Sequence, residues 1–92
     1  MSTKQERTQR AEQEQEHERS LEAAIRMNVM QDLGRPAELV QVQVRQLWES
    51  NYRVNVFVGT DAASARVAHS FFLTADAFGV VIASTPAITR LY

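Results

Sequence analysis

The chain has 92 residues, of which 45% are hydrophobic, and its formal net charge is −1. A chain of this length makes one domain, and it contains no apolar run near the roughly 18 residues that a membrane-spanning helix needs. The absence of cysteine excludes disulfides and thiolate metal sites, and the small net charge excludes a global attraction to nucleic acid or anionic lipid.

Residues 1–19 form a polar segment in which Ala11 is the only apolar residue after Met1. Glu12 and Glu16 place like charges four residues apart, which destabilises an isolated helix. We expect this segment to be a charged extension, helical or flexible, in front of a single α+β domain over residues 20–92. It carries no apolar segment of the secretory type, so we expect a cytoplasmic protein of bacterial origin.

Residues 20–33 show the apolar spacing of an amphipathic helix. Ser20 can serve as the N-cap, and Gly34 and Pro36 stand where a helix ends. Its apolar residues recur every three or four positions: Leu21, Ala24, Ile25, Val29 and Leu33. The pattern predicts a helix over 20–33 with one face to bury.

Residues 39–58 show the alternation of a β-hairpin with one buried face. Its inward positions are valines: Val40, Val42, Val44, Val54, Val56 and Val58. We expect a three-residue loop over 49–51 with Asn51 in the left-handed conformation. This loop would pair Val44 with Val56 and place Trp48 opposite Tyr52.

The second half of the chain predicts two further strands. Residues 66–74 and 80–84 are rich in β-prone side chains and are separated by a turn-like segment. A helix over 62–71 is the alternative. Pro86 ends the fourth strand, and residues 86–92 are expected to lie as a tail along the domain.

These elements predict an α+β fold, with the N-terminal helix packed on a four-stranded antiparallel β-meander. One helix covers one side of such a sheet, so the other side is left open. That side is expected to carry a partner-binding patch of apolar and basic residues: Arg45, Leu47, Arg53, Phe57 and Phe72. We expect a homodimer through this face or through an edge strand. The alternative is that the C-terminal tail, with Ile88, Leu91 and Tyr92, folds over the patch.

Residues that carry chemistry are few. His69 and Ser70 are neighbours in a strand and point to opposite faces, so they cannot act as a base and nucleophile. By its alternation with Val67 and Phe71, His69 is expected to be a hydrogen-bonded core or pocket histidine; its alternative role is a ligand contact. Two distant histidines without cysteine make no metal site, and isolated glycines make no phosphate loop. We therefore expect no catalytic residue, metal or cofactor.

The sequence thus predicts a small non-enzymatic protein that self-associates or binds a protein partner through the exposed sheet face, away from membranes. One alternative is a single-stranded nucleic-acid-binding module that uses the arginines and aromatic rings of the same face. The net charge of −1 and the scarcity of lysine disfavour it. A second alternative is a small-molecule pocket near His69.

Overall fold

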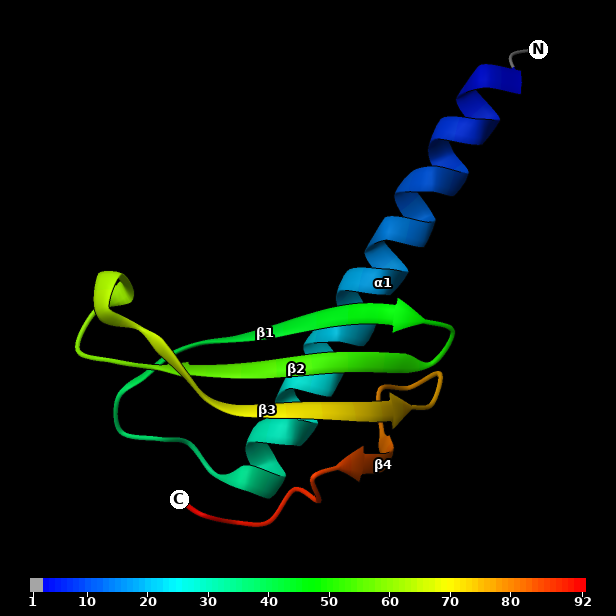
Figure 1. The fold of residues 1–92 in the computed structure, drawn as a ribbon. Helices are drawn as coiled ribbons and strands as arrows, with labels where there is room; N and C mark the ends of the chain where they lie inside the picture. The colour runs from blue at the N-terminus through cyan, green and yellow to red at the C-terminus, as the bar shows by residue number, and fades with distance from the viewer. Residues whose placement is uncertain (1–2) are drawn as a thin grey trace.

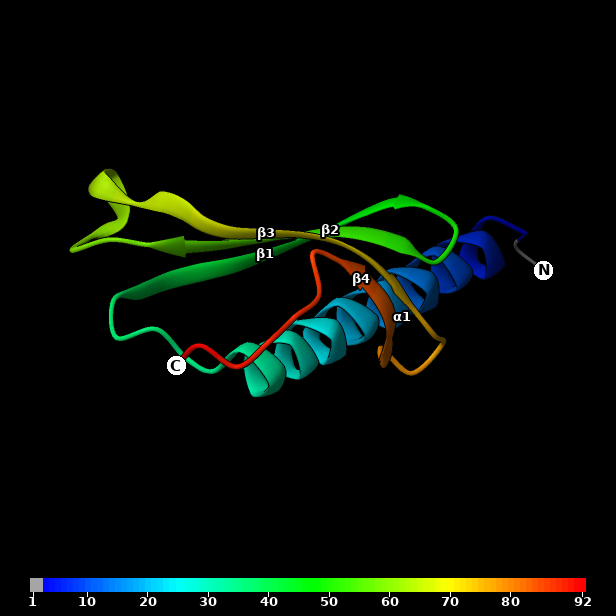
Figure 2. The same cartoon turned by 60° about the horizontal axis from the view of Figure 1, so that its bottom comes forward.

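The computed structural model describes residues 3–92, with side chains from residue 12 onward. One helix precedes four strands: α1 (Thr3–Leu33), β1 (Leu39–Trp48), β2 (Asn51–Val58), β3 (Arg66–Ala75) and β4 (Val81–Thr85). A 3-10 turn, η1 (Ala62–Ser64), lies between β2 and β3. The strands form one antiparallel sheet in the order β1-β2-β3-β4, with α1 against one face (Figures 1 and 2). The predicted α+β fold is confirmed.

Helix α1 is longer than the sequence analysis placed it. It runs without a break from Thr3 to Leu33, so Ser20 lies inside the helix and the predicted N-cap is wrong. The Glu, Gln and Arg residues before Ser20 are good helix formers and continue a helix whose C-terminal half is anchored by packing. Its 31 residues make a helix about 46 Å long, and its N-terminal part projects beyond the sheet (Figure 1). Residues 1 and 2 of the predicted extension lie outside the described residues.

The C-terminal end of α1 is formed as predicted. Gly34 adopts a φ of 86°, in the left-handed region that favours glycine, and its N–H donates to the Met30 carbonyl at 2.9 Å. The buried stripe of the helix is Ile25, Val29 and Leu33, each 1% exposed or less. It packs on the valines of β1 and β2 and on Phe71 and Leu73 of β3. The central prediction, that the valines face the helix, is confirmed for Val42, Val44, Val54, Val56 and Val58, which are all buried. Val40 is the exception: it is the extra residue between Leu39 and Gln41, and Leu39 packs against the core in its place.

The hairpin register differs from the prediction by two residues. Val44 lies opposite Val54, and Val42 lies opposite Val56. The connection is Glu49 and Ser50, and Glu49 rather than Asn51 has the positive φ, at 47°. A shift of two residues keeps every side chain on its face, which is why the valines still point inward.

A bulge next to this turn reverses the expected position of Trp48. The pairing shifts between Gln46 and Trp48, so that Trp48 lies opposite Asn51 rather than Tyr52. An extra residue in one strand changes the face of the residues beyond it. Trp48 is therefore on the face away from α1, and the predicted Trp48–Tyr52 pair does not form.

The β3–β4 half confirms the predicted strands in place of the alternative helix over 62–71. A second irregularity, between Val56 and Phe57, places Val67 opposite Phe57. Val67 thus lies on the face away from α1, and not on the face of Phe71 as its alternation suggested.

The C-terminal tail lies on the helix side of the sheet, so it does not cover the opposite face (Figure 2). The N–H groups of Leu91 and Tyr92 donate to the Leu33 carbonyl at 2.9 and 3.2 Å. Ile88 packs against the core. The expectation of a tail along the domain is confirmed, and the alternative that it folds over the patch is wrong. Within the described residues, no helix is long and apolar enough to cross a membrane.

Candidate functional site

The first candidate site is the open face, which we define as the face of the sheet turned away from α1. The structure brings three of the predicted residues into one row across three strands. Arg45 of β1 lies opposite Arg53 of β2, and Arg53 lies opposite Phe72 of β3. Phe57 and Leu47 share this face, toward the two ends of the strands. All five predicted partner-binding residues therefore lie on one surface.

Trp48 and Val67 are open-face residues that the sequence analysis missed, and Trp48 is the larger and more exposed of the two. Its ring centroid lies 5.6 Å from that of Phe72, with the planes tilted by 41°. The indole is 56% exposed, and the neighbouring Leu47 is 39% exposed. The bulge places these two consecutive apolar residues on the same side of the sheet. Period-two alternation gave no sign of it, because alternation assigns neighbours to opposite faces.

The open face carries positive charge without a counterion of its own. Its remaining paired strand positions are neutral: Gln41, Gln43, Asn51, Asn55, Val67, Ser70, Thr74, Ala83 and Thr85. Arg53 donates from Nη1 to Ser70 Oγ at 3.3 Å, and Ser70 Oγ donates to Asn55 Oδ1 at 2.7 Å. This network holds Arg53 along the sheet beside Arg45. Like charges directly opposite on two strands are destabilising, so a ligand with acceptors or π-faces would relieve them.

The far end of the open face is a shallow apolar hollow. It has a volume of about 210 Å³ and is lined by Val40, Gln41, Phe57, Ala62 and Ala65. The Asp61 side chain accepts from the Ser64 N–H at 2.9 Å and so fixes η1, which forms the rim. The open face therefore has an apolar group at each end, with the two arginines between them.

His69 has a structural position. It is half-buried, and its Nε2 lies 2.7 Å from the Tyr92 hydroxyl. Its ring stacks on Phe71 at 6.2 Å and meets Tyr92 edge-on at 5.6 Å. The predicted hydrogen bond is present, but His69 lies outside the buried core, and its contacts fasten the C-terminal tail to β3. A ligand contact at His69 stays a prediction.

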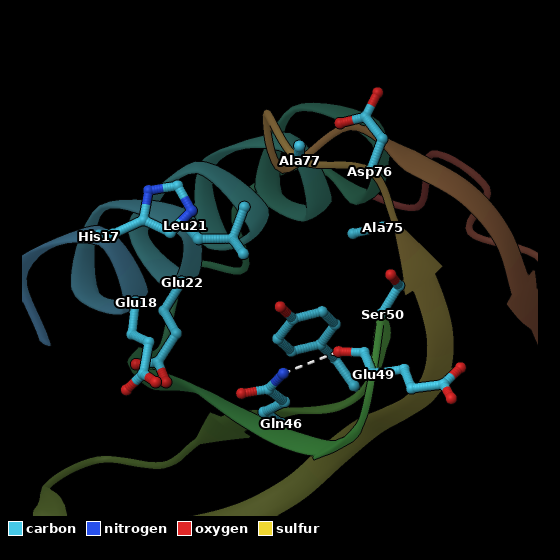
Figure 3. Close-up of a pocket in the computed structure, with 11 residues that line it drawn as sticks. His17, Glu18, Leu21, Glu22, Gln46, Glu49, Ser50, Ala75, Asp76 and Ala77 are labelled. Carbon is cyan, nitrogen blue, oxygen red and sulfur yellow. Dashed lines mark hydrogen bonds between the residues drawn. The ribbon is translucent and has the colours of Figure 1, made fainter. Parts of the chain in front are cut away.

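The second candidate site is a cavity of about 320 Å³ between α1 and two turns of the sheet, here called the helix-side cavity (Figure 3). Three segments line it: His17, Glu18, Leu21 and Glu22 from α1; Gln46, Glu49, Ser50 and Tyr52 from the β1–β2 hairpin; Ala75, Asp76 and Ala77 after β3. The sequence analysis missed it, because these segments meet only in the folded chain. The one available signal was Tyr52, the only polar side chain on the inward face of β2.

Two polar side chains that line the cavity already make hydrogen bonds within the protein. Gln46 donates from Nε2 to the Glu49 carbonyl at 2.7 Å. Asp76 Oδ1 accepts from the N–H groups of Phe78 and Val80 at 2.8 and 3.0 Å, so Asp76 serves the β3–β4 turn. Figure 3 shows its carboxylate directed away from the cavity.

The acidic side chains on α1 act on the tyrosine of the hairpin. Burial raises the pKa of the Tyr52 phenol above its ordinary value, and the charges of Glu22 and Glu18 raise it further. The phenol is therefore neutral at physiological pH and lies within the field of two carboxylates. Among the described residues, no group of three or more His, Asp or Glu side chains is placed to hold a metal ion.

The comparisons with known proteins add no family to this description. Neither family models, nor curated proteins, nor solved structures give a match to this chain. The function is therefore inferred from the open face and the helix-side cavity themselves.

Proposed function

We propose that the protein is a non-enzymatic binding module that self-associates through its open face to form a homodimer. The observation that carries the proposal is the contact of the exposed Trp48 with the half-buried Phe72, on a sheet face that neither α1 nor the C-terminal tail covers. Apolar patches of this kind on a small domain mark interaction surfaces. A contact between two copies would cover Leu47 and Trp48 and extend a core that is limited by the size of the chain.

The arrangement of charge and rings on the open face suits a two-fold contact. In such a contact each pairing occurs twice, and the same patch faces itself. Two open faces stacked about a two-fold axis, with their strands running in opposite directions, would place the arginines of one copy over the Trp48–Phe72 pair of the other. A guanidinium over an aromatic face is worth about 0.5–2 kcal/mol, depending on desolvation. This arrangement also keeps the arginines of the two copies apart.

The edges of the sheet are less suited to pairing than its open face. Arg26 donates from Nε to the Val42 carbonyl at 3.0 Å, which occupies an acceptor of the edge strand β1. The other edge strand, β4, has only 5 residues. Short edges and edges blocked by charged side chains resist strand addition. We therefore assign the dimer contact to the face.

The test compares two charged substitutions at exposed aromatic residues. Trp48→Arg places a charge on the open face, whereas Phe78→Arg places one on the β3–β4 turn, where the ring is 82% exposed. Size exclusion with light scattering at high micromolar concentration should give a dimer for the wild type and Phe78→Arg, and a monomer for Trp48→Arg. A monomeric wild type, or a Trp48→Arg dimer, would refute the proposal.

A second candidate function has one observation in its favour. The strands of the open face combine two arginines with three aromatic rings and carry no acidic residue, as single-strand-binding surfaces do. Two phosphate contacts predict a slope of about −1.4 for log K against log salt. Fluorescence polarisation with a labelled oligothymidylate, repeated at several salt concentrations, measures this slope. Binding that is absent, or that does not weaken with salt, excludes this candidate.

A cytoplasmic location stays a prediction.

A further inference from the structure

The helix-side cavity contains a buried tyrosine whose hydroxyl group is not used by the fold. Tyr52 is 3% exposed and lines the cavity. Among the described residues the hydroxyl has no hydrogen-bond partner, yet none of their fully enclosed side-chain polar atoms lacks one. The hydroxyl is therefore not sealed in the core but opens into the cavity. A buried polar group kept in this position is suited to a ligand, because a buried tyrosine hydroxyl usually finds a partner.

The acidic side chains on the α1 side of the cavity are two glutamates, and His17 also lines this side. Glu18 and Glu22 both line it and are one helical turn apart. Figure 3 shows both side chains extending from α1 toward the hairpin. Like charges at this spacing oppose helix formation, so the pair is a cost to the free protein. Tyr52 lines the same cavity, and the charges of the two carboxylates add to the effect of burial in raising its pKa.

The other residues that line the cavity restrict the class of ligand that could bind in it. Four acidic residues line the cavity, and its only basic side chain among the described residues is that of His17, so the lining favours a cation over an anion. The Gln46 amide group donates one hydrogen bond to the Glu49 carbonyl, and its amide oxygen is an acceptor that a ligand could use. The side chains of Leu21, Ala75 and Ala77 form the apolar part of the cavity wall. The occupant should therefore present hydrogen-bond donors and a positive charge at one end and an apolar body at the other.

We propose that the helix-side cavity binds a small organic ammonium ion. Its N–H groups would donate to the carboxylates of Glu18 and Glu22 and to the hydroxyl oxygen of Tyr52. The cavity volume of about 320 Å³ is at the small end of the range for ligand sites, which suits a compact amine. A divalent metal is disfavoured because the described residues offer no group of three ligating side chains.

The first experiment uses three probes of similar size: phenethylammonium, 2-phenylethanol and 3-phenylpropionate. Calorimetry and amide chemical shifts should show the ammonium binding at least about tenfold tighter than the alcohol, with the carboxylate not bound. Equal affinity for the ammonium and the alcohol, or no binding of the ammonium, overturns the proposal. Binding of Nα-acetyl-lysine methylamide at least as tight as that of phenethylammonium would identify the source as a partner's lysine side chain rather than a free amine.

The second experiment uses a matched pair of double variants. Glu18→Gln with Glu22→Gln removes the cavity charges, whereas Glu12→Gln with Glu16→Gln removes the same charge at the same spacing from exposed positions of α1. The first pair should weaken phenethylammonium binding by roughly tenfold and the second by less than about twofold. Equal losses in both pairs would show general electrostatic attraction and overturn the site.

Stability and the tyrosine supply independent readouts. Without ligand, the cavity pair of substitutions should leave the unfolding temperature unchanged or raised, since it removes a like-charge contact. A large fall would show that these carboxylates serve the fold and would overturn the proposal. Tyr52→Phe should weaken binding by about threefold with the fold intact. Trp48→Arg should bind the probe as the wild type does, so failure of the cavity is distinguishable from failure of the open face.

Discussion

Replacing Gly79 by alanine should destabilise the protein through one identifiable contact. Gly79 ends the β3–β4 turn with a φ of 82°, and its carbonyl accepts from Asn28 Nδ2 at 2.7 Å. A Cβ at this position would lie 2.6 Å from the Cβ of Ala24 on α1. The turn that carries Asp76 and Ala77 is thus pressed onto the helix where it forms one wall of the helix-side cavity.

The magnitude follows from three terms. The left-handed conformation costs a non-glycine residue about 1–2 kcal/mol. Forcing a methyl group into a filled site costs about 1–3 kcal/mol. The lower entropy of the unfolded alanine chain returns about 0.4–1 kcal/mol. The net loss is about 2–3 kcal/mol, which corresponds to a fall of roughly 10–20 °C in Tm for a domain of this size.

Urea and thermal unfolding followed by circular dichroism measure the loss, and a double-mutant cycle separates its parts. Ala24→Gly alone should cost about 1 kcal/mol as a helix-interior glycine. Combined with Gly79→Ala, it removes the clash, so the double variant should be about 1–2 kcal/mol more stable than the sum of the single losses. An unchanged midpoint for Gly79→Ala, or a coupling energy of zero, would refute the packing of this turn on α1.

Three further predictions concern the core, the edge and the cavity. Leu73→Ala should lower the free energy of unfolding by about 2–5 kcal/mol in urea titration, because the side chain is fully buried; a smaller loss would show that the core collapses onto the gap. Arg26→Met should cost about 1–2 kcal/mol by the same assay, since it removes the bond to the Val42 carbonyl; no loss would mean that water replaces the guanidinium. The pKa of Tyr52 is raised in the folded protein. Its contribution to the free energy of unfolding is therefore fully present below its ordinary pKa of 10.0 and is lost as the pH rises through the pKa of the folded state. Tyrosinate absorbance in a Tyr92→Phe variant should titrate above the ordinary range, and the alkaline loss of stability should be smaller in Tyr52→Phe.

The parts of the fold that depend on periodicity could be predicted from the sequence. The inward valines and the helix end at Gly34 are set by local alternation, spacing and φ requirements, which act within a few residues. The prediction that the hairpin valines face inward stayed correct although the predicted register was wrong by two residues, because side chains on a strand return to the same face every two residues. The start of α1 was placed at Ser20 because a helix without a buried face has no periodic signal.

Features set by single inserted residues or by distant segments could not be predicted in this way. The bulge before Trp48 brings the exposed indole onto the open face, and the irregularity after Val56 does the same for Val67. Neither has a marker such as glycine at the extra position. The helix-side cavity needs Glu22, Tyr52 and Ala77 together, and only the docking of α1 on the sheet unites them.

The emission of Trp48 tests the open-face interface most directly, because it is the only tryptophan in the chain. The indole is more than half exposed in the single chain and would be covered in the proposed dimer. Its emission should shift to the blue, and acrylamide quenching should fall, over the concentration range in which light scattering reports the change from monomer to dimer. An indole that stays fully quenchable after the mass has doubled, or a mass that never doubles, would contradict the account.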